Sequence, residues 1–308
     1  MKNILITGAS GYIGQELLGR VSQSHKGHEI FALYYNNPIV AGNKNITPIR
    51  VNLSKANEYK KLPKSIDKLI HLAGDKRTFL LGNEGRKQFY YNHNLTKLIL
   101  RYLNRSNCNS IIFASSVYIY SGVMDLPFSE DRLKMPKDYL GLSKFFSESL
   151  FKAYSSKSSS KTICLRIFTT YGSKISEKQF VDNAINRLKS NSKKETFYNP
   201  NICRDFIHKI DVVEAFIKTL KFMNKKEKPY FNSINIATGK STKIKDLILE
   251  LADLIGTKKQ IQFGKSTEFQ NDIDHAASIK KMQDLYKWQP SITLTEGLKE
   301  ALTSNEKK

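Results

Sequence analysis

Long apolar runs are missing from this sequence. No stretch approaches the roughly 18 consecutive apolar residues that a membrane-spanning helix requires, so we expect no membrane partner. The opening "MKNILITGAS" offers an apolar run of only three residues before a glycine turn, which is too short for a secretory signal peptide. These two absences predict a cytoplasmic protein.

Cysteine is also scarce. The three cysteines, Cys108, Cys164 and Cys203, lie far apart and form no C-x-x-C pair. This spacing argues against a disulfide framework and against a structural zinc site. We therefore expect reduced thiols and no bound metal.

Acidic residues are few, with 28 Asp and Glu against 50 Lys and Arg and a net charge of +22. Such an excess can indicate nucleic-acid binding. Most of it, however, is lysine spread along the chain, in small clusters such as "NKKEK" and "GTKKQ", whereas nucleic-acid sites concentrate arginine and aromatic residues on one face. We interpret the charge as a solvated lysine-rich surface and predict no nucleic-acid partner.

Three glycines near the N-terminus have a spacing that is typical of a strand–turn–helix unit. In "NILITGASGYIGQELL" an apolar strand is followed by Gly8, Gly11 and Gly14, and Tyr12 and Ile13 begin a helical pattern. The first glycine permits a tight turn, the second lets backbone N–H groups approach a diphosphate, and the third lets the helix pack closely on the sheet. The alternative is a plain βα turn, but the position after the first strand favours a dinucleotide site.

The second apolar strand, "EIFALYY", ends at the position where dinucleotide sites select their coenzyme. The candidates are Tyr34, Tyr35, Asn36 and Asn37. No carboxylate is present to select NAD and no arginine to select NADP, and Asn36 can bond either ribose. The choice between NAD and NADP stays open, with NAD slightly favoured.

Buried runs alternate with helical segments over the following residues. "KLIHLAG" reads as a strand ending in small residues, and "NLTKLILRYL" reads as a helix. This alternation predicts an α/β fold with a doubly wound parallel sheet of the Rossmann type.

A collinear series of motifs makes the chain resemble the extended short-chain dehydrogenase/reductase family of nucleotide-sugar epimerases, dehydratases and reductases. The series begins with "TGASGYIG", "LIHLAG", "IIFASSVYIY" and "GLSK". It continues through "LRIFTTYG", "CRDFIHKIDVVEA", "NIATGKS" and "KWQPSITLTEGL". The resemblance therefore covers nearly the whole chain.

The resemblance implies a coenzyme lobe over residues 1–168 and a smaller C-terminal substrate lobe over 169–308, with 204–237 returning to the first lobe. It also implies a homodimer formed through two helices, near 84–104 and 139–155. The serine-rich "SSKSSSKT" (155–162) is expected to be a surface loop between a helix and a strand.

The resemblance also assigns coenzyme contacts beyond the glycines. Asn52 and Leu53 would lie against the adenine. Leu72, Ala73 and Gly74 would lie along the central part of the coenzyme, and Asn94 stands on the following helix.

Family chemistry moves a hydride between nicotinamide and a sugar carbon, while a tyrosinate carries the hydroxyl proton. A nearby lysine lowers the tyrosine pKa and binds the nicotinamide ribose, and a serine hydroxyl bonds the reacting oxygen. The resemblance gives the serine and lysine roles to Ser116 and Lys144. Leu140, however, stands where the tyrosine belongs, and Tyr139 lies five residues before Lys144 instead of four.

Residues four apart share one face of a helix, whereas residues five apart do not. On a regular helix Tyr139 would therefore point about a quarter turn away from the face that carries Lys144. Three interpretations follow. A bulge or a late helix start brings Tyr139 to Lys144; another tyrosine, Tyr118 or Tyr171, carries the proton; or the protein binds coenzyme without the standard hydride chemistry.

The resemblance suggests the substrate through a few residues. Arg204 matches an arginine that grips a nucleotide diphosphate, and Thr169 stands where the family has a substrate-binding asparagine. Dehydratases carry an acidic pair where this chain has Val117 and Tyr118, which disfavours a dehydratase. A second phosphate-binding arginine is absent near "EFQND" (268–272).

Two functions remain from the sequence. The first is an NAD(P)-dependent epimerase or reductase acting on a nucleotide-sugar, with Ser116, Tyr139 and Lys144 as catalytic candidates. The second is a coenzyme-binding relative with lost or altered catalysis that acts as a sensor or partner subunit.

Overall fold

The computed structural model describes residues 2–39, 42–78, 80–172, 179–227, 229–265 and 274–305. The chain divides into two compact units. The N-terminal unit comprises residues 1–123, 133–166 and 213–234, and the C-terminal unit comprises 124–132, 167–212 and 235–308.

A seven-stranded sheet forms the centre of the N-terminal unit. The pairs β5–β4, β4–β1, β1–β2 and β2–β3 are all parallel, and β1 lies between β4 and β2, so the strand order reverses beside β1. Ligands bind at such a switch point, beyond the carboxyl ends of the strands. The predicted Rossmann-type fold is confirmed. In sheet order the strands are β10 (Tyr230–Ile236), β6 (Lys161–Ile167), β5 (Ser110–Ser116), β4 (Lys68–His71), β1 (Lys2–Thr7), β2 (His28–Tyr34) and β3 (Ile46–Arg50).

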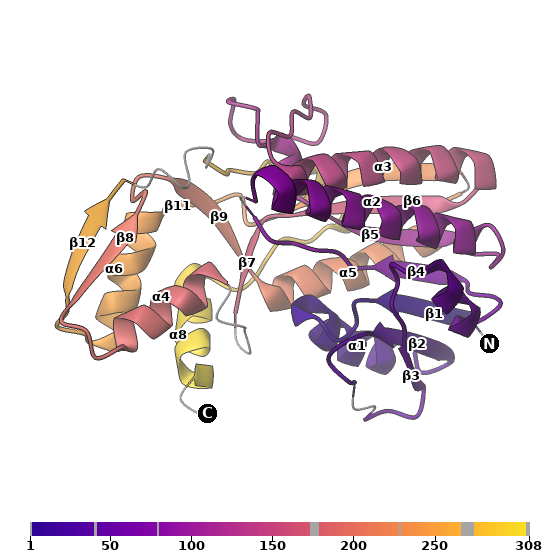
Figure 1. Cartoon of the computed structure of the whole chain (residues 1–308), viewed down its shortest axis with the longest axis horizontal. Coiled ribbons are helices and arrows are strands. Elements are labelled where there is room, and N and C mark those ends of the chain that lie inside the picture. Colours follow the sequence, from indigo (N-terminus) through magenta and orange to yellow (C-terminus); the bar gives the residue numbers. More distant parts are fainter. Residues whose placement is uncertain are drawn as a thin grey trace. The chain divides into compact units, whose positions relative to one another are not determined.

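Helices cover both faces of this sheet. Figure 1 shows α2 and α3 side by side on one face, with α1 and the greater part of α5 on the other. Leu95 and Ile99 of α2 and Phe151 of α3 are buried in one apolar cluster with Leu5 and Phe113 of the strands. This burial fixes the sheet under the two helices. The helices are α1 (Tyr12–Ser24), α2 (Gly82–Leu103), α3 (Tyr139–Ser158) and α5 (Lys209–Asn224), with short 3-10 turns at η1 (Ala56–Lys61) and η2 (Val117–Tyr120).

The serine-rich segment 155–162 is not a loop, so that prediction is wrong. Helix α3 continues through Ser158, and β6 begins at Lys161. The hydroxyl groups of Ser156 and Ser158 donate to the carbonyls of the residues four positions earlier, at 3.2 and 2.8 Å. Because these bonds satisfy the serine side chains along the helix itself, the composition does not end it.

The C-terminal unit is built from short strands and helices. Strand β9 pairs in parallel with β7 and antiparallel with β11, and β8 pairs with β12. Apolar side chains of α4, α6 and α8 form its core. No helix in the described ranges is long and apolar enough to cross a membrane. The elements are β7 (Thr169–Tyr171), α4 (Phe180–Lys189), β8 (Lys194–Tyr198), β9 (Cys203–His208), β11 (Ser241–Lys243), α6 (Ile244–Ile255), β12 (Gln260–Gly264), α7 (Lys280–Tyr286) and α8 (Leu294–Asn305).

Candidate active site

The turn between β1 and α1 lets a ligand approach the main chain closely. Gly8 has φ +68°, and a Cβ there would lie 2.9 Å from the amide nitrogen of Ala73. A Cβ at Gly14 would overlap the Gly8 carbonyl, so α1 packs directly on the turn. Helix α1 begins at Tyr12 and has Gly11 as its N-cap, without a side-chain cap. The first turn therefore presents main-chain donors, the arrangement that binds a diphosphate.

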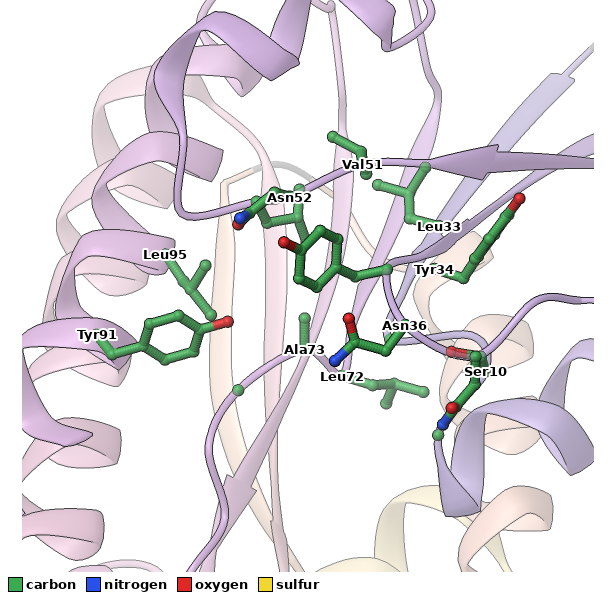
Figure 2. A pocket seen from close by; sticks show the side chains of 16 residues that line it. Ser10, Leu33, Tyr34, Asn36, Val51, Asn52, Leu72, Ala73, Tyr91 and Leu95 are labelled. Carbon is green, nitrogen blue, oxygen red and sulfur yellow. The ribbon is translucent and has the colours of Figure 1, made fainter.

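A cavity of about 320 Å³ extends from this turn along the carboxyl ends of the strands. None of the residues that line it is acidic or basic. Figure 2 shows Tyr91 of α2 and Asn36, after β2, facing each other across it. The lining residues are Gly8, Ser10, Gly11, Leu33, Tyr34, Tyr35, Asn36, Asn37, Val51, Asn52, Leu53, Leu72, Ala73, Gly74, Tyr91 and Leu95.

Most coenzyme residues expected from the sequence therefore lie together. Tyr12, Ile13 and Gly14 form the first turn of α1 and do not line the cavity. Ser10 and Tyr91 do line it, and the sequence did not indicate either. The sequence did not indicate Tyr91 because its position at the cavity depends on how α2 packs on the sheet. No local sequence pattern predicts that packing.

Asn52 and Asn94 both act on the loop after β3. The Asn52 Oδ1 accepts from the amide and hydroxyl of Ser54, at 3.0 and 2.7 Å. The Asn94 side-chain amide donates to the Ser54 carbonyl at 3.1 Å, and Asn94 does not line the cavity. Asn52 thus shapes a cavity wall, while Asn94 holds the loop from behind.

Asn92 is a residue that the sequence reasoning missed. Its Oδ1 accepts from the amide of Asp75 at 2.8 Å, and its Nδ2 donates to the Asp75 carbonyl at 2.9 Å and to the Ser143 hydroxyl at 3.1 Å. It joins the turn after β4, helix α2 and helix α3. The only sequence signal was a polar residue within the buried face of a helix, four residues before Thr96.

The carboxyl end of β5 brings Ser116 and Lys144 to one place. The Lys144 ammonium donates to the carbonyl of Ala114 at 2.8 Å and lies 4.9 Å from the ring centroid of Phe113. Ser116, two residues further along β5, accepts a hydrogen bond from the amide of Tyr118 at 3.3 Å. A hydroxyl and a cation at the end of one strand can together bind an oxygen that changes charge.

Burial strongly perturbs Lys144. Desolvation lowers the pKa of Lys144 to about 8, although the carboxylate of Glu148, four residues further along α3, acts in the opposite direction. Glu148 itself forms a buried bidentate ion pair with Arg166, which also donates to the hydroxyl of Tyr120. This network ties α3 to β6 and to η2 beside Ser116.

The side chain of Tyr139 packs on helix α2. Helix α3 begins regularly at Tyr139, and the N-cap Asp138 accepts from the amide of Gly141 at 2.8 Å. The Tyr139 ring packs against Gly85 of α2, at a position where a Cβ would overlap it. Leu140 is only 4% exposed. Neither a bulge nor a late helix start is present.

The other two tyrosines differ in setting. Tyr118 follows Ser116 closely in η2 and is partly exposed. Tyr171 is buried in the C-terminal unit, where its hydroxyl donates to the carbonyl of Thr293 at 3.2 Å, and burial raises its pKa. Of the two, Tyr118 lies in the same unit as Ser116 and Lys144.

Two of the three expected substrate residues, Arg204 and Thr169, lie in the C-terminal unit, and Ser116 lies in the N-terminal unit. Arg204 of β9 is buried, and its Nη1 lies 2.9 and 2.7 Å from the ring nitrogens of His275. Thr169 of β7 pairs with Phe206 of β9. The segment 268–272, where a second arginine was expected, lies outside the described residues.

Comparison with known proteins gives the site its context. A family model described as "NAD dependent epimerase/dehydratase family" matches residues 4–237. The chain is 25% identical to the dTDP-4-dehydro-6-deoxyglucose reductase of Escherichia coli, over 98% of this chain and 96% of the relative.

Two solved structures have the same fold. One is a point mutant of UDP-glucuronic acid 4-epimerase from Bacillus cereus, in complex with a fluorinated UDP-sugar and NAD, at a TM-score of 0.87, 22% identity and 99% coverage of each chain. The other is RMD from Pseudomonas aeruginosa with NADPH, at a TM-score of 0.83, 20% identity and 100% coverage of each chain. Proteins of this fold thus include one with NAD and one with NADPH.

Proposed function

Because this chain belongs to the NAD dependent epimerase/dehydratase family, we propose that it is a nicotinamide-coenzyme-dependent epimerase or reductase acting on a nucleotide-activated sugar. The observation that carries the proposal is the continuous path from the glycine turn through the cavity to Ala73 and Gly74. Relatives with names of this kind match nearly the whole chain.

The coenzyme fits the residues present. The crowding at Gly8 and Gly14 leaves the main-chain N–H groups of the first turn of α1 as the donors for a diphosphate. Asn36 and Asn52 lie where an adenosine would be held. When bound, a nicotinamide coenzyme supplies hydride exchange with a sugar carbon; NAD and NADP both suit this proposal, and the sequence slightly favours NAD.

The protein contributes a hydroxyl and a cation at the end of β5. Ser116 would bond the reacting sugar oxygen, and Lys144 would hold the nicotinamide ribose and stabilise negative charge there. We propose Tyr118, two residues after Ser116, as the proton carrier on this unit. Val117 and Tyr118 supply no carboxylate, which supports an epimerase or reductase over a dehydratase.

Arg204 and Thr169 complete the proposal on the substrate side. A guanidinium suits a nucleotide diphosphate because its planar fork can bond two oxygens at once. We propose that Arg204 binds the diphosphate and that Thr169 replaces an asparagine with a shorter hydroxyl.

We also propose a homodimer through α2 and α3. Their outer surfaces carry exposed aromatic side chains, with Tyr90 66% and Phe146 43% exposed. Phe89 and Phe146 form an edge-to-face pair with centroids 5.6 Å apart, which gives the two helices one apolar surface.

The test uses purified protein, the oxidised and reduced forms of both coenzymes, and a panel of UDP- and dTDP-sugars. We expect micromolar coenzyme binding by calorimetry and turnover of at least one sugar nucleotide, lost in Lys144→Met. Binding without any turnover would instead support the coenzyme-binding alternative. If neither NADH nor NADPH binds at millimolar concentration, the proposal fails.

A further inference from the structure

The end of β2 borders the cavity, and the neighbouring strand β3 supplies a cation there. The parallel register pairs Tyr34 with Arg50, and the amide of Val51 donates to the Tyr34 carbonyl at 2.9 Å. The Arg50 Nε donates to the carbonyl of Tyr35 at 3.3 Å. Tyr34 and Tyr35 both line the cavity, so the Arg50 guanidinium bonds the main chain of a lining residue without itself being part of the lining.

The rest of this guanidinium is available to a ligand. Arg50 is exposed, and within the described residues no carboxylate forms an ion pair with it. The bond to Tyr35 uses only Nε, so the two terminal nitrogens can donate to a ligand. A fork held in this way suits two oxygens of a phosphate.

The cavity itself favours an additional anion. Its lining contains no Asp or Glu, and Asn36 and Asn37 add neutral amide donors beside Tyr35. In a dinucleotide site, the carboxylate at the end of the second strand binds the ribose 2′-hydroxyl and repels a 2′-phosphate. Here that repulsion is missing and a cation is present in its place.

We propose that Arg50 binds the 2′-phosphate of the adenosine ribose and makes this protein selective for NADP(H) over NAD(H). The inference rests on the proposed function, because it assumes that the cavity holds a nicotinamide dinucleotide. It changes the slight preference for NAD drawn from the sequence. The arginine comes from β3, whereas the sequence pattern places a selecting arginine at the end of β2.

The test is equilibrium binding, which needs no sugar substrate. Dissociation constants for NADPH and NADH would be measured by fluorescence or calorimetry in the unmodified protein and in Arg50→Met, Arg50→Lys and Arg101→Met. The last variant removes an equally charged, exposed arginine from the final turn of α2, away from the cavity. Adenosine 2′,5′-bisphosphate and 5′-AMP would repeat the comparison without the nicotinamide half.

We expect the unmodified protein to bind NADPH at least about tenfold more tightly than NADH, with an advantage that shrinks as salt is added. Arg50→Met should abolish this advantage and leave NADH binding within twofold, Arg50→Lys should keep part of it, and Arg101→Met should keep all of it. Equal losses for both coenzymes in Arg50→Met, no change, or a preference for NADH in the unmodified protein would overturn the inference. Failure of both coenzymes to bind would instead remove the proposed function.

Discussion

At the residue scale, the substitution of leucine for the expected tyrosine has the largest chemical consequence. Leu140 begins the buried face of α3, directly after Tyr139, which packs on Gly85. A leucine can neither give nor take a proton, so another group has to carry the acid–base step, and Tyr118 is the one we propose. Placing a tyrosine at position 140 tests which group carries the proton, because turnover should rise only if that group is missing.

Leu140→Tyr restores the four-residue spacing to Lys144. If tyrosine is the missing acid–base group, turnover should rise by about 100-fold, the lower range for general acid–base catalysis. Turnover would be followed by chromatography of the sugar-nucleotide product, because an epimerase causes no net change in coenzyme absorbance. Tyr139→Phe is the matched control and should change turnover less than twofold. A Leu140→Tyr protein that folds, binds coenzyme and gains nothing would show that another group already carries the proton.

Lys144 predicts an unusual dependence of stability on pH. Its pKa is about 8 in the folded protein and near 10.5 when unfolded. Between these values the unfolded chain binds more protons, so stability should rise as the pH increases from about 8 to 10, and below pH 8 the full cost of burying the charge is present. Lys144→Met removes this cost and should raise Tm at pH 7.

The measurement is thermal unfolding of both proteins from pH 7 to pH 10. The Tm advantage of Lys144→Met should shrink across this range. A difference in Tm that does not vary with pH would mean that Lys144 titrates near its ordinary value.

At the element scale, the sequence predicts features that repeat locally. The glycine turn and the apolar strands of the sheet are predicted correctly because each depends on neighbours in the chain. Local sequence patterns do not predict contacts between residues that are distant in the chain. Arg50 reaches the Tyr35 carbonyl through strand register, and Asn92 reaches the turn after β4 through helix packing. The serine-rich end of α3 misled the prediction because composition does not reveal bonds to the helix's own carbonyls.

Asn92 and Asn94 provide a matched pair on α2. Asn92→Ala removes three hydrogen bonds at a buried position and should lower the free energy of unfolding by about 1–3 kcal/mol. The Asp75 amide loses its partner, whereas the Ser143 hydroxyl keeps its bond to the Leu140 carbonyl. Asn94→Ala removes one bond to Ser54 and should cost about 1 kcal/mol. Urea unfolding of the two variants measures the difference, and equal losses would contradict the assigned role of Asn92.

At the scale of the whole molecule, net charge and apolar surface oppose each other in association. A charge of +22 disfavours nonspecific contact between copies. The exposed aromatic side chains of α2 and α3 favour one specific contact. Association that persists at low salt, where repulsion is strongest, would therefore depend on this surface.

The matched variants for this surface are Phe146→Glu and Leu249→Glu. Their side chains are 43% and 44% exposed and lie on helices of different units. We expect Phe146→Glu to convert a dimer to a monomer and Leu249→Glu to leave the dimer intact, because only the first places charge on the proposed interface. Light scattering coupled to size-exclusion chromatography reports both masses. A monomeric unmodified protein would reject the proposed dimer.

The three cysteines differ in exposure, so one of them can be labelled selectively. Cys108 and Cys164 are buried, and burial raises the pKa of the Cys164 thiol, while Cys203 is partly exposed next to Arg204. A maleimide dye should therefore label one position of the native enzyme without any engineering. A fluorophore attached there would test, in real time, whether a phosphorylated compound binds near β9, where Arg204 is the proposed diphosphate ligand.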